Sequence, residues 1–164
     1  RKKIHTLLTA SLTPIHDNYV INHQQMPIVR AHVGGDFFKD DYFLAWMDLA
    51  NNFDLTQFYA YTKRLDLWIL YMDEIPANFE LNASRGGKFD NLIDLHNLKS
   101  AEVVYSPEEA ERKGLELDHD DSHAYNKGPS FGQLIHGCQP AGSNASKALT
   151  QLKDSIGWTG YSNK

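Results

Sequence analysis

Polar side chains that could bind or transform a ligand stand near the ends of several predicted strands. His32, Asp36 and His136 are of types that transfer protons, so they are the candidate catalytic residues. Arg30 and Lys63 carry the positive charge that an anionic group requires. The alternative for each histidine is a structural role, paired with a carboxylate or a backbone carbonyl. The sequence thus predicts an anion-binding site with acid–base groups beside it.

Glycines follow the same strand ends. Gly34-Gly35, Gly86-Gly87 and Gly137 each come shortly after a β-rich run. Glycine permits a positive φ or a close approach of the backbone to a ligand, although any single glycine can equally belong to an ordinary turn. Because three strand ends share this feature, we predict that they form one ligand-binding edge. The predicted ligand-binding residues are Arg30, Gly34, Gly35, Tyr61, Lys63, Ser84, Arg85, Gly86, Gly87 and Gly137.

Two other patterns are weaker. Gly137 and Gly142 have the spacing of a phosphate-binding loop, but no Lys-Ser or Lys-Thr pair follows them, so only the start of a helix near Ser143 could hold an anion. The run from Asp118 to His123 is rich in metal-binding residue types, yet it does not match a calcium loop, and we expect a solvated polar loop there. The sequence identifies no cofactor and no metal-binding set.

Alternating β-rich and amphipathic segments must position these residues. We predict strands at residues 26–33, 57–62, 79–84, 101–105 and 131–136. Helices are expected at residues 39–52, 65–74 and 91–96, after Ser106, and from about residue 144; residues 1–25 also look helical. Such alternation predicts an α/β fold in which parallel strands alternate with helices, as an incomplete βα barrel or an open sheet.

One face of several predicted strands is polar. Side chains alternate along a strand, so Arg30 and His32 are expected on one face. The corresponding face of the next strand should carry Tyr59, Tyr61 and Lys63. The third strand repeats the pattern with Glu80, Asn82 and Ser84. We predict that these lines of polar residues face a common cavity, and the alternative is an open sheet with one solvated face.

Length and charge limit the class of protein. The chain has 164 residues, a formal net charge of -5 and one cysteine, Cys138. These values predict a single α/β domain over residues 1–164 and disfavour a nucleic-acid-binding role that depends on bulk positive charge. No apolar stretch is long enough to span a membrane, and a cytoplasmic location is expected. The oligomeric state stays open.

Several segments together resemble a known family. They are residues 30–38 (RAHVGGDFF), 42–46 (YFLAW), 58–63 (FYAYTK), 78–84 (NFELNAS), 86–88 (GGK) and 136–137 (HG). In this order they are similar to the bacteriophage gene-product-88 family over about residues 28–150. The resemblance implies a phage setting, with the host cytoplasm as the location, rather than a particular reaction.

The resemblance also bears on the start of the chain. Residues 1–25 look helical with no strand before them, so the sequence is expected to begin partway through a βα unit. Members of the family usually carry a cysteine-rich segment ahead of the Arg30 strand, and the resemblance implies that a sequence without it is truncated or partial. A cysteine cluster followed by Gly34-Gly35-Asp36 also resembles the opening of radical S-adenosylmethionine enzymes, in which the acidic residue holds the amino group of the cofactor. This sequence has no set of cysteines for the cluster.

The sequence therefore leaves two interpretations of function. The first is an uncharacterised phage-type protein with a small-molecule or anion-binding pocket at the carboxyl ends of its strands, in one form a degenerate or truncated radical-S-adenosylmethionine-like enzyme. The second is a non-catalytic interaction or structural module whose polar strand faces form a buried hydrogen-bond network. Whether the protein is an enzyme is not decided by its residues alone.

Overall fold

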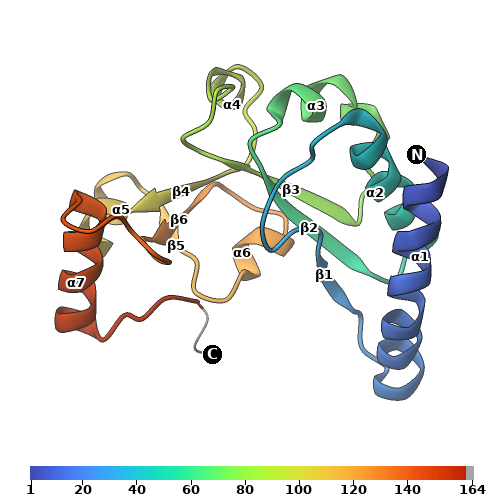
Figure 1. Ribbon diagram of the computed structural model, residues 1–164, viewed down its shortest axis with the longest axis horizontal. Helices are drawn as coiled ribbons and strands as arrows, with labels where there is room; N and C mark the ends of the chain where they lie inside the picture. The colour runs from blue at the N-terminus through green and yellow to red at the C-terminus, as the bar shows by residue number, and fades with distance from the viewer. Residues whose placement is uncertain (162–164) are drawn as a thin grey trace.

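The fold is built on one sheet of six parallel strands that curls into an open half-barrel (Figure 1). The computed structural model describes residues 1–161. The strand order is β1-β2-β3-β4-β6-β5. The strands are β1 (Ile28–Arg30), β2 (Gln57–Thr62), β3 (Phe79–Ser84), β4 (Ser100–Val104), β5 (Glu116–Leu117) and β6 (Phe131–Leu134). The predicted α/β class with an open parallel sheet is confirmed.

Helices connect successive strands, as the alternating sequence pattern requires. Seven are α-helices, one is a π-helix (η1) and one is a 3₁₀-helix (η2) within the described residues. They are α1 (Lys2–Asp17), η1 (Asn18–His23), α2 (Asp40–Asn52), α3 (Leu65–Leu70), η2 (Met72–Glu74), α4 (Asn91–Leu95), α5 (Pro107–Arg112), α6 (Ser122–Tyr125) and α7 (Asn144–Ile156). In Figure 1, α1 and α2 lie at one end of the sheet and α5 and α7 at the other.

The start of α5 shows how local sequence fixes an element boundary. The Ser106 hydroxyl accepts a hydrogen bond from the Glu109 backbone N–H at 3.2 Å, and Pro107 occupies the first turn. The Glu109 carboxylate accepts from the Tyr105 N–H at 2.7 Å, which satisfies a second backbone donor at this end. The helix ends before Gly114, which has a φ of 65°. The sequence-based prediction of this helix is confirmed.

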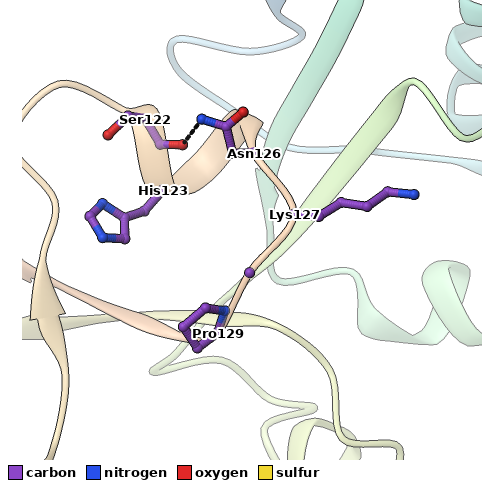
Figure 2. A pocket seen from close by; sticks show the side chains of 6 residues that line it. Ser122, His123, Asn126, Lys127 and Pro129 are labelled. Atoms are coloured by element: carbon purple, nitrogen blue, oxygen red, sulfur yellow. Dashed lines mark hydrogen bonds between the residues drawn. The ribbon is translucent and has the colours of Figure 1, made fainter.

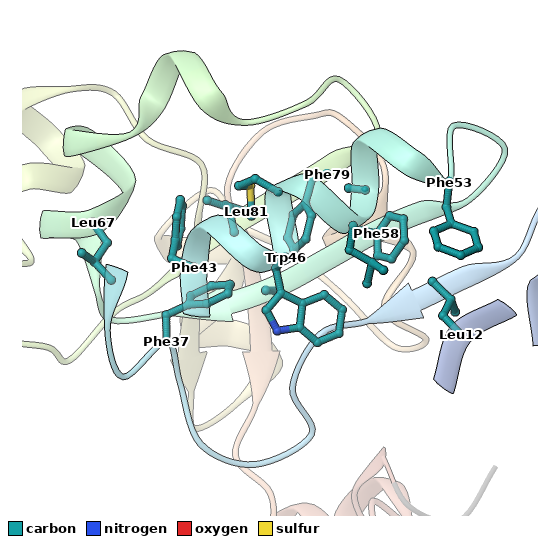
Figure 3. Close-up of a cluster of buried hydrophobic side chains, with 13 residues drawn as sticks. Leu12, Phe37, Phe43, Trp46, Phe53, Phe58, Leu67, Phe79 and Leu81 are labelled. Carbon is teal, nitrogen blue, oxygen red and sulfur yellow. The ribbon is translucent and has the colours of Figure 1, made fainter. Parts of the chain in front are cut away.

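The outer face of the sheet forms the main apolar core (Figure 3). Phe58 of β2 and Phe79 of β3 are buried and stack with their ring centroids 5.7 Å apart. Trp46 of α2 meets Phe58 edge-on, and Leu12 of α1 packs in the same cluster. Burial of an apolar side chain of this size contributes about 1.5–3 kcal/mol. These contacts hold α1 and α2 against the first three strands.

The inner face of the half-barrel is polar and partly filled. Tyr59 and Tyr61 of β2 point to this face, where they pack near Ala124 of α6 and Phe131 of β6. Asn82 of β3 is fully buried and donates a hydrogen bond to the Ala124 carbonyl at 2.9 Å. The predicted alternation therefore holds for Tyr59, Tyr61 and Asn82, which face a shared interior, whereas Lys63 lies beyond the end of β2 and is exposed. The short helix α6 occupies part of that interior.

The structure differs from the sequence-based expectation at β1. This strand has three residues and ends at Arg30, whereas residues 26–33 were predicted. Alternation stops at Arg30, so His32 does not share the inner face with it and instead contacts aromatic side chains beside α2. Val33, the last residue of the predicted strand, is 89% exposed. The chain leaves the sheet after Arg30, and the Gly34-Gly35 pair, in which Gly35 has a φ of 87°, lies in the loop that follows.

Candidate functional site

The carboxyl ends of the first strands are joined by the side chain of Asp36. Its Oδ1 atom accepts hydrogen bonds from the Phe37 N–H at 2.7 Å and from the Thr62 hydroxyl at 2.6 Å. Its Oδ2 atom accepts from the Lys63 N–H at 2.7 Å. Asp36 thus fixes the loop after β1 to the end of β2. The carboxylate receives three donors from the chain itself, which does not fit the radical S-adenosylmethionine arrangement in which it would hold a cofactor amino group.

Lys63 and a glycine turn connect the ends of β2 and β3. The Lys63 ammonium donates to the carbonyls of Ser84 and Arg85 at 3.0 and 2.8 Å. The N–H groups of Gly86 and Gly87 both donate to the carboxylate of Asp90, each at 2.8 Å. Gly86 has a φ of 93°, a conformation in which a residue with a Cβ would be strained. The predicted residues Lys63, Ser84 and Arg85 therefore lie together, and their hydrogen bonds are to one another.

Arg30 lies where the inner face opens at the end of β1. Its guanidinium stands over the Tyr61 ring, 4.8 Å from the ring centroid, and its Nε donates to the His32 carbonyl at 2.7 Å. The nearest carboxylate is that of Asp121, with an NH1-to-Oδ2 distance of 3.5 Å, at the long limit of a hydrogen bond. About a third of the Arg30 side chain, 34%, is accessible to solvent. The guanidinium is therefore held in place and reachable.

The carboxylate of Asp121 accepts hydrogen bonds from polar groups of the inner face. Its Oδ2 accepts from the Tyr59 hydroxyl and its Oδ1 from the Tyr61 hydroxyl, both at 2.8 Å. The Tyr61 oxygen also accepts a hydrogen bond from the Gln133 amide at 2.9 Å. Burial, together with the Asp121 charge and hydrogen bond, raises the pKa of Tyr59 and of Tyr61. Both hydroxyls therefore stay protonated and remain donors at neutral pH.

Next to Asp121 lies a buried acid–histidine group. Asp118 is fully buried, and its Oδ1 lies 3.3 Å from Nδ1 of His123. The other ring nitrogen of His123 lies 3.0 Å from the Glu116 carboxylate. The hydrogen bond with Glu116, and then that with Asp118, raises the pKa of His123 despite its partial burial. The expectation of a solvated polar loop over residues 118–123 is wrong at Asp118, which is fully buried, and at Asp121, which is partly buried against the sheet, while residues 119 and 120 are exposed.

The structure separates the two predicted catalytic histidines. His32 packs edge-on against Phe37, with ring centroids 4.5 Å apart, and also near Trp46, on the outer side of the sheet. Burial lowers the pKa of His32. His136 lies at the end of β6, where its Nδ1 is 2.8 Å from the Leu134 carbonyl and its ring meets Tyr161 edge-on. His136 therefore fits the structural interpretation, whereas both ring nitrogens of His32 are buried without a hydrogen-bond partner among the described residues.

The remaining predicted residues have different surroundings. Arg85 donates to Asp94 at 3.1 Å and to the Ser100 hydroxyl at 3.3 Å, so its charge is directed away from Arg30. The loops at Gly34-Gly35 and at Gly137 are open, since a Cβ placed at any of these glycines would meet no atom within 4 Å. A ligand could therefore approach the backbone at these glycines.

A separate pocket of about 190 Å³ lies on the outer side of α6 (Figure 2). Ser122, His123 and Asn126 line one side of it, and the Asn126 amide donates to the Ser122 carbonyl at 3.0 Å. The other side is formed by Lys127, Gly128 and Pro129. None of the residues predicted from the sequence lines this pocket. Sequence reasoning gave no signal for it because it is created by the turn between α6 and β6.

Two further properties of residues 1–161 concern metals and membranes. This part of the chain contains no group of three or more His, Cys, Asp and Glu side chains that could hold a metal ion. None of its helices combines the length and the apolar character needed to cross a bilayer. Cys138 is a free, exposed thiol.

Comparison with known proteins identifies the family. The profile described as Gene product 88 matches residues 7–152, which is most of the chain. The chain belongs to the gene product 88 family. The resemblance to this phage family that the sequence suggested is thereby confirmed. No curated protein and no solved structure gives a significant match to this gene product 88 chain.

Within this gene product 88 protein, the structure brings together only part of the predicted site. Arg30 and Tyr61 meet on the inner face, while Asp36, Lys63, Ser84, Gly86 and Gly87 gather at the neighbouring strand ends. Sequence reasoning placed Tyr59 and Asn82 on the polar strand faces without naming them as site residues, and it missed Gln133, Asp118 and Asp121 as parts of the site. The sequence did contain a signal for this contact. Two tyrosine hydroxyls on one buried strand face need hydrogen-bond acceptors, and the run from residue 118 to 121 supplies carboxylates.

Proposed function

We propose that this protein binds a small anionic ligand at the carboxyl ends of β1 and β2, with the Arg30 guanidinium as the main contact. The observation that carries the proposal is the loose pairing of Arg30. Arg64 forms two 2.8 Å bonds with Asp66, and Arg1 likewise pairs with both oxygens of Asp48. By contrast, the nearest carboxylate to Arg30 stands at 3.5 Å. The Arg30 guanidinium is fixed on an aromatic ring, and its N–H groups form no close pair with a carboxylate. Such an arginine is suited to bind a carboxylate or phosphate.

The position of Arg30 supports the same proposal. In parallel α/β sheets ligands bind beyond the carboxyl ends of the strands, and Arg30 is the last residue of β1. The Arg30 side chain is itself open to solvent, with 34% of its surface exposed. The tyrosine hydroxyls of β2 add neutral donors beside the positive charge. Together these groups offer an anion both charge and hydrogen bonds.

Titration calorimetry with inorganic phosphate at constant ionic strength tests the proposal. The native protein should bind phosphate in a saturable way. Replacement Arg30→Ala should weaken binding roughly ten- to a hundredfold, since a hydrogen bond to a charged group contributes about 1.5–3 kcal/mol. Arg112→Ala, on the exposed side of α5, is the matched control and should bind as the native protein does. Equal phosphate binding by the Arg30→Ala protein would overturn the proposal.

A second candidate is a module without a ligand, in which the polar strand ends serve the fold. The contacts of Asp36 and Lys63 favour it, because each joins the end of one strand to the next loop through three and two hydrogen bonds. This candidate expects Arg30→Ala to lower the free energy of unfolding without any effect on phosphate binding. Urea unfolding of the same variants therefore separates the two candidates.

A further inference from the structure

We infer that the carboxylate of Asp121 occupies the ligand position of this site as an internal ligand, and that the external ligand which displaces it carries a carboxylate group. The inference rests on the proposed function, whose site it describes more closely. The ligand class, a carboxylate, is inferred from the Asp121 carboxylate that the site already holds. The inference also predicts that the site is closed in the ligand-free protein and opens when the loop that carries Asp121 moves.

The first argument is the geometry of the contacts around Asp121. Each carboxylate oxygen receives one tyrosine hydroxyl at 2.8 Å, from Tyr59 on Oδ2 and from Tyr61 on Oδ1. The Arg30 guanidinium stands 3.5 Å from Oδ2. Two donors directed at two oxygens of one planar group, with a cation at its side, are the contacts expected in recognition of a carboxylate. All three donors come from neighbouring strands of one sheet.

The second argument is that donors and acceptor differ in rigidity. Tyr59 and Tyr61 lie within β2, which is paired on both sides, by β1 and by β3. Asp121 instead lies in the connection between β5 and α6, where its φ is 64°. The left-handed region is unfavourable for a residue with a Cβ, so tertiary contacts must hold Asp121 there. A ligand that takes over the tyrosine hydroxyls would allow this strain to relax.

The third argument is that contacts on both sides of Asp121 anchor the loop in addition to the contacts of the Asp121 side chain. On one side, the Asp118 N–H donates to the Gly132 carbonyl at 2.9 Å, and the Tyr161 hydroxyl donates to the Asp118 carbonyl at 2.8 Å. On the other side, Asn82 holds the Ala124 carbonyl. A change confined to residue 121 therefore leaves the attachments of the loop intact, and a local movement can expose the tyrosine hydroxyls.

Chemical rescue with acetate tests the inference. The replacement Asp121→Gly removes the Cβ and the carboxylate, which acetate matches in size, and glycine tolerates the positive φ. Acetate should bind the Asp121→Gly protein at least about tenfold more tightly than it binds the native protein, at equal ionic strength. The double replacement Arg30→Ala with Asp121→Gly should lose this gain. Acetate binding no tighter than in the native protein would overturn the inference.

A second variant covers the case in which Asp121→Gly does not fold. Asp121→Asn keeps the size of the side chain but removes the charge that competes at Arg30, so inorganic phosphate should bind about three- to tenfold more tightly than to the native protein. Asp94→Asn, which removes a charge beside Arg85 instead, is the matched control and should leave phosphate binding unchanged. Weaker or equal phosphate binding by the Asp121→Asn protein would overturn the inference.

The outcomes distinguish this inference from the proposed function. If the native protein binds phosphate through Arg30, but acetate and phosphate affinities do not respond to the two Asp121 variants, only the internal-ligand inference is wrong. If no anion binds to the native protein or to any Asp121 variant, the proposed function is wrong as well, and the inference falls with it.

Discussion

The Tyr61 hydroxyl lies 2.8 Å from the Asp121 carboxylate, although 60 positions separate the two residues in the sequence. Tyr61 is fixed by the pairing of β2 with its neighbours, and Asp121 is placed by the loop that enters α6. The contact therefore reports whether the loop is seated on the inner face of the sheet. Stability and ligand binding should both depend on it.

Replacing Tyr61 with phenylalanine should destabilise the protein by about 1–3 kcal/mol, because it removes a largely buried hydrogen bond to a charged acceptor. Urea unfolding followed by circular dichroism measures the change in the free energy of unfolding. Tyr71→Phe is the control: the Tyr71 hydroxyl donates to Asp40 at the surface, so its loss should have a smaller effect. A Tyr61→Phe protein as stable as the native one would mean that the Asp121 contact does not form.

Asp36→Asn should also destabilise the protein, by roughly 1–3 kcal/mol. The side-chain amide would place N–H donors next to the Thr62 hydroxyl or the Lys63 N–H, which now donate to Asp36. Thermal unfolding provides the measurement, and the exposed Asp54→Asn serves as the reference. If the two replacements have equal effects, the carboxylate does not connect β1 to β2.

His32 should make the protein less stable in acid. Burial holds its folded-state pKa below the unfolded value of about 6.5, so the unfolded chain binds more protons between these two values. The free energy of unfolding should therefore fall as the pH drops below about 6.5. His32→Phe preserves the contacts with Phe37 and Trp46 and should flatten this part of the profile. A native and a variant profile with the same slope would contradict the prediction.

His123 should have the opposite effect. Its carboxylate partners raise its pKa in the folded protein, so its contribution to stability is complete below about pH 6.5 and is lost as the pH rises through the raised value. His123→Gln should remove this decline while leaving the acid side of the profile, where His32 acts, unchanged. Urea titrations across the neutral range measure both slopes. A decline that persists in the His123→Gln protein would assign it to another group.

The sequence predicted the central strands well because their signal is local. Residues 57–62 and 79–84 alternate between apolar and polar side chains, and the structure has β2 and β3 at these positions. The same alternation correctly indicated that Tyr61 and Asn82 face the interior. Capping residues likewise fixed the start of α5 at Ser106. In each case neighbouring residues alone determine the conformation.

The acidic loop could not be predicted in this way because its burial depends on distant partners. Residues 118–123 are hydrophilic, and composition alone favours a solvated loop. Asp118 is buried because the two-residue strand β5 pairs with β6, a contact too short to leave a sequence pattern. Asp121 is placed by Tyr59 and Tyr61, which lie about sixty positions earlier in the chain. His32 was misplaced for a related reason, since β1 ends before it.

The most direct test of the anion site follows the side-chain resonances of the arginines by nuclear magnetic resonance during a phosphate titration at constant ionic strength. The Nε–H resonance of Arg30, assigned by its loss in an Arg30→Lys protein, should shift along a saturable curve, because phosphate competes for the unsaturated guanidinium. The resonances of Arg1 and Arg64, whose forks are paired with Asp48 and Asp66, should stay in place. An Arg30 resonance that does not move, or that drifts linearly together with the others, would contradict the proposed site.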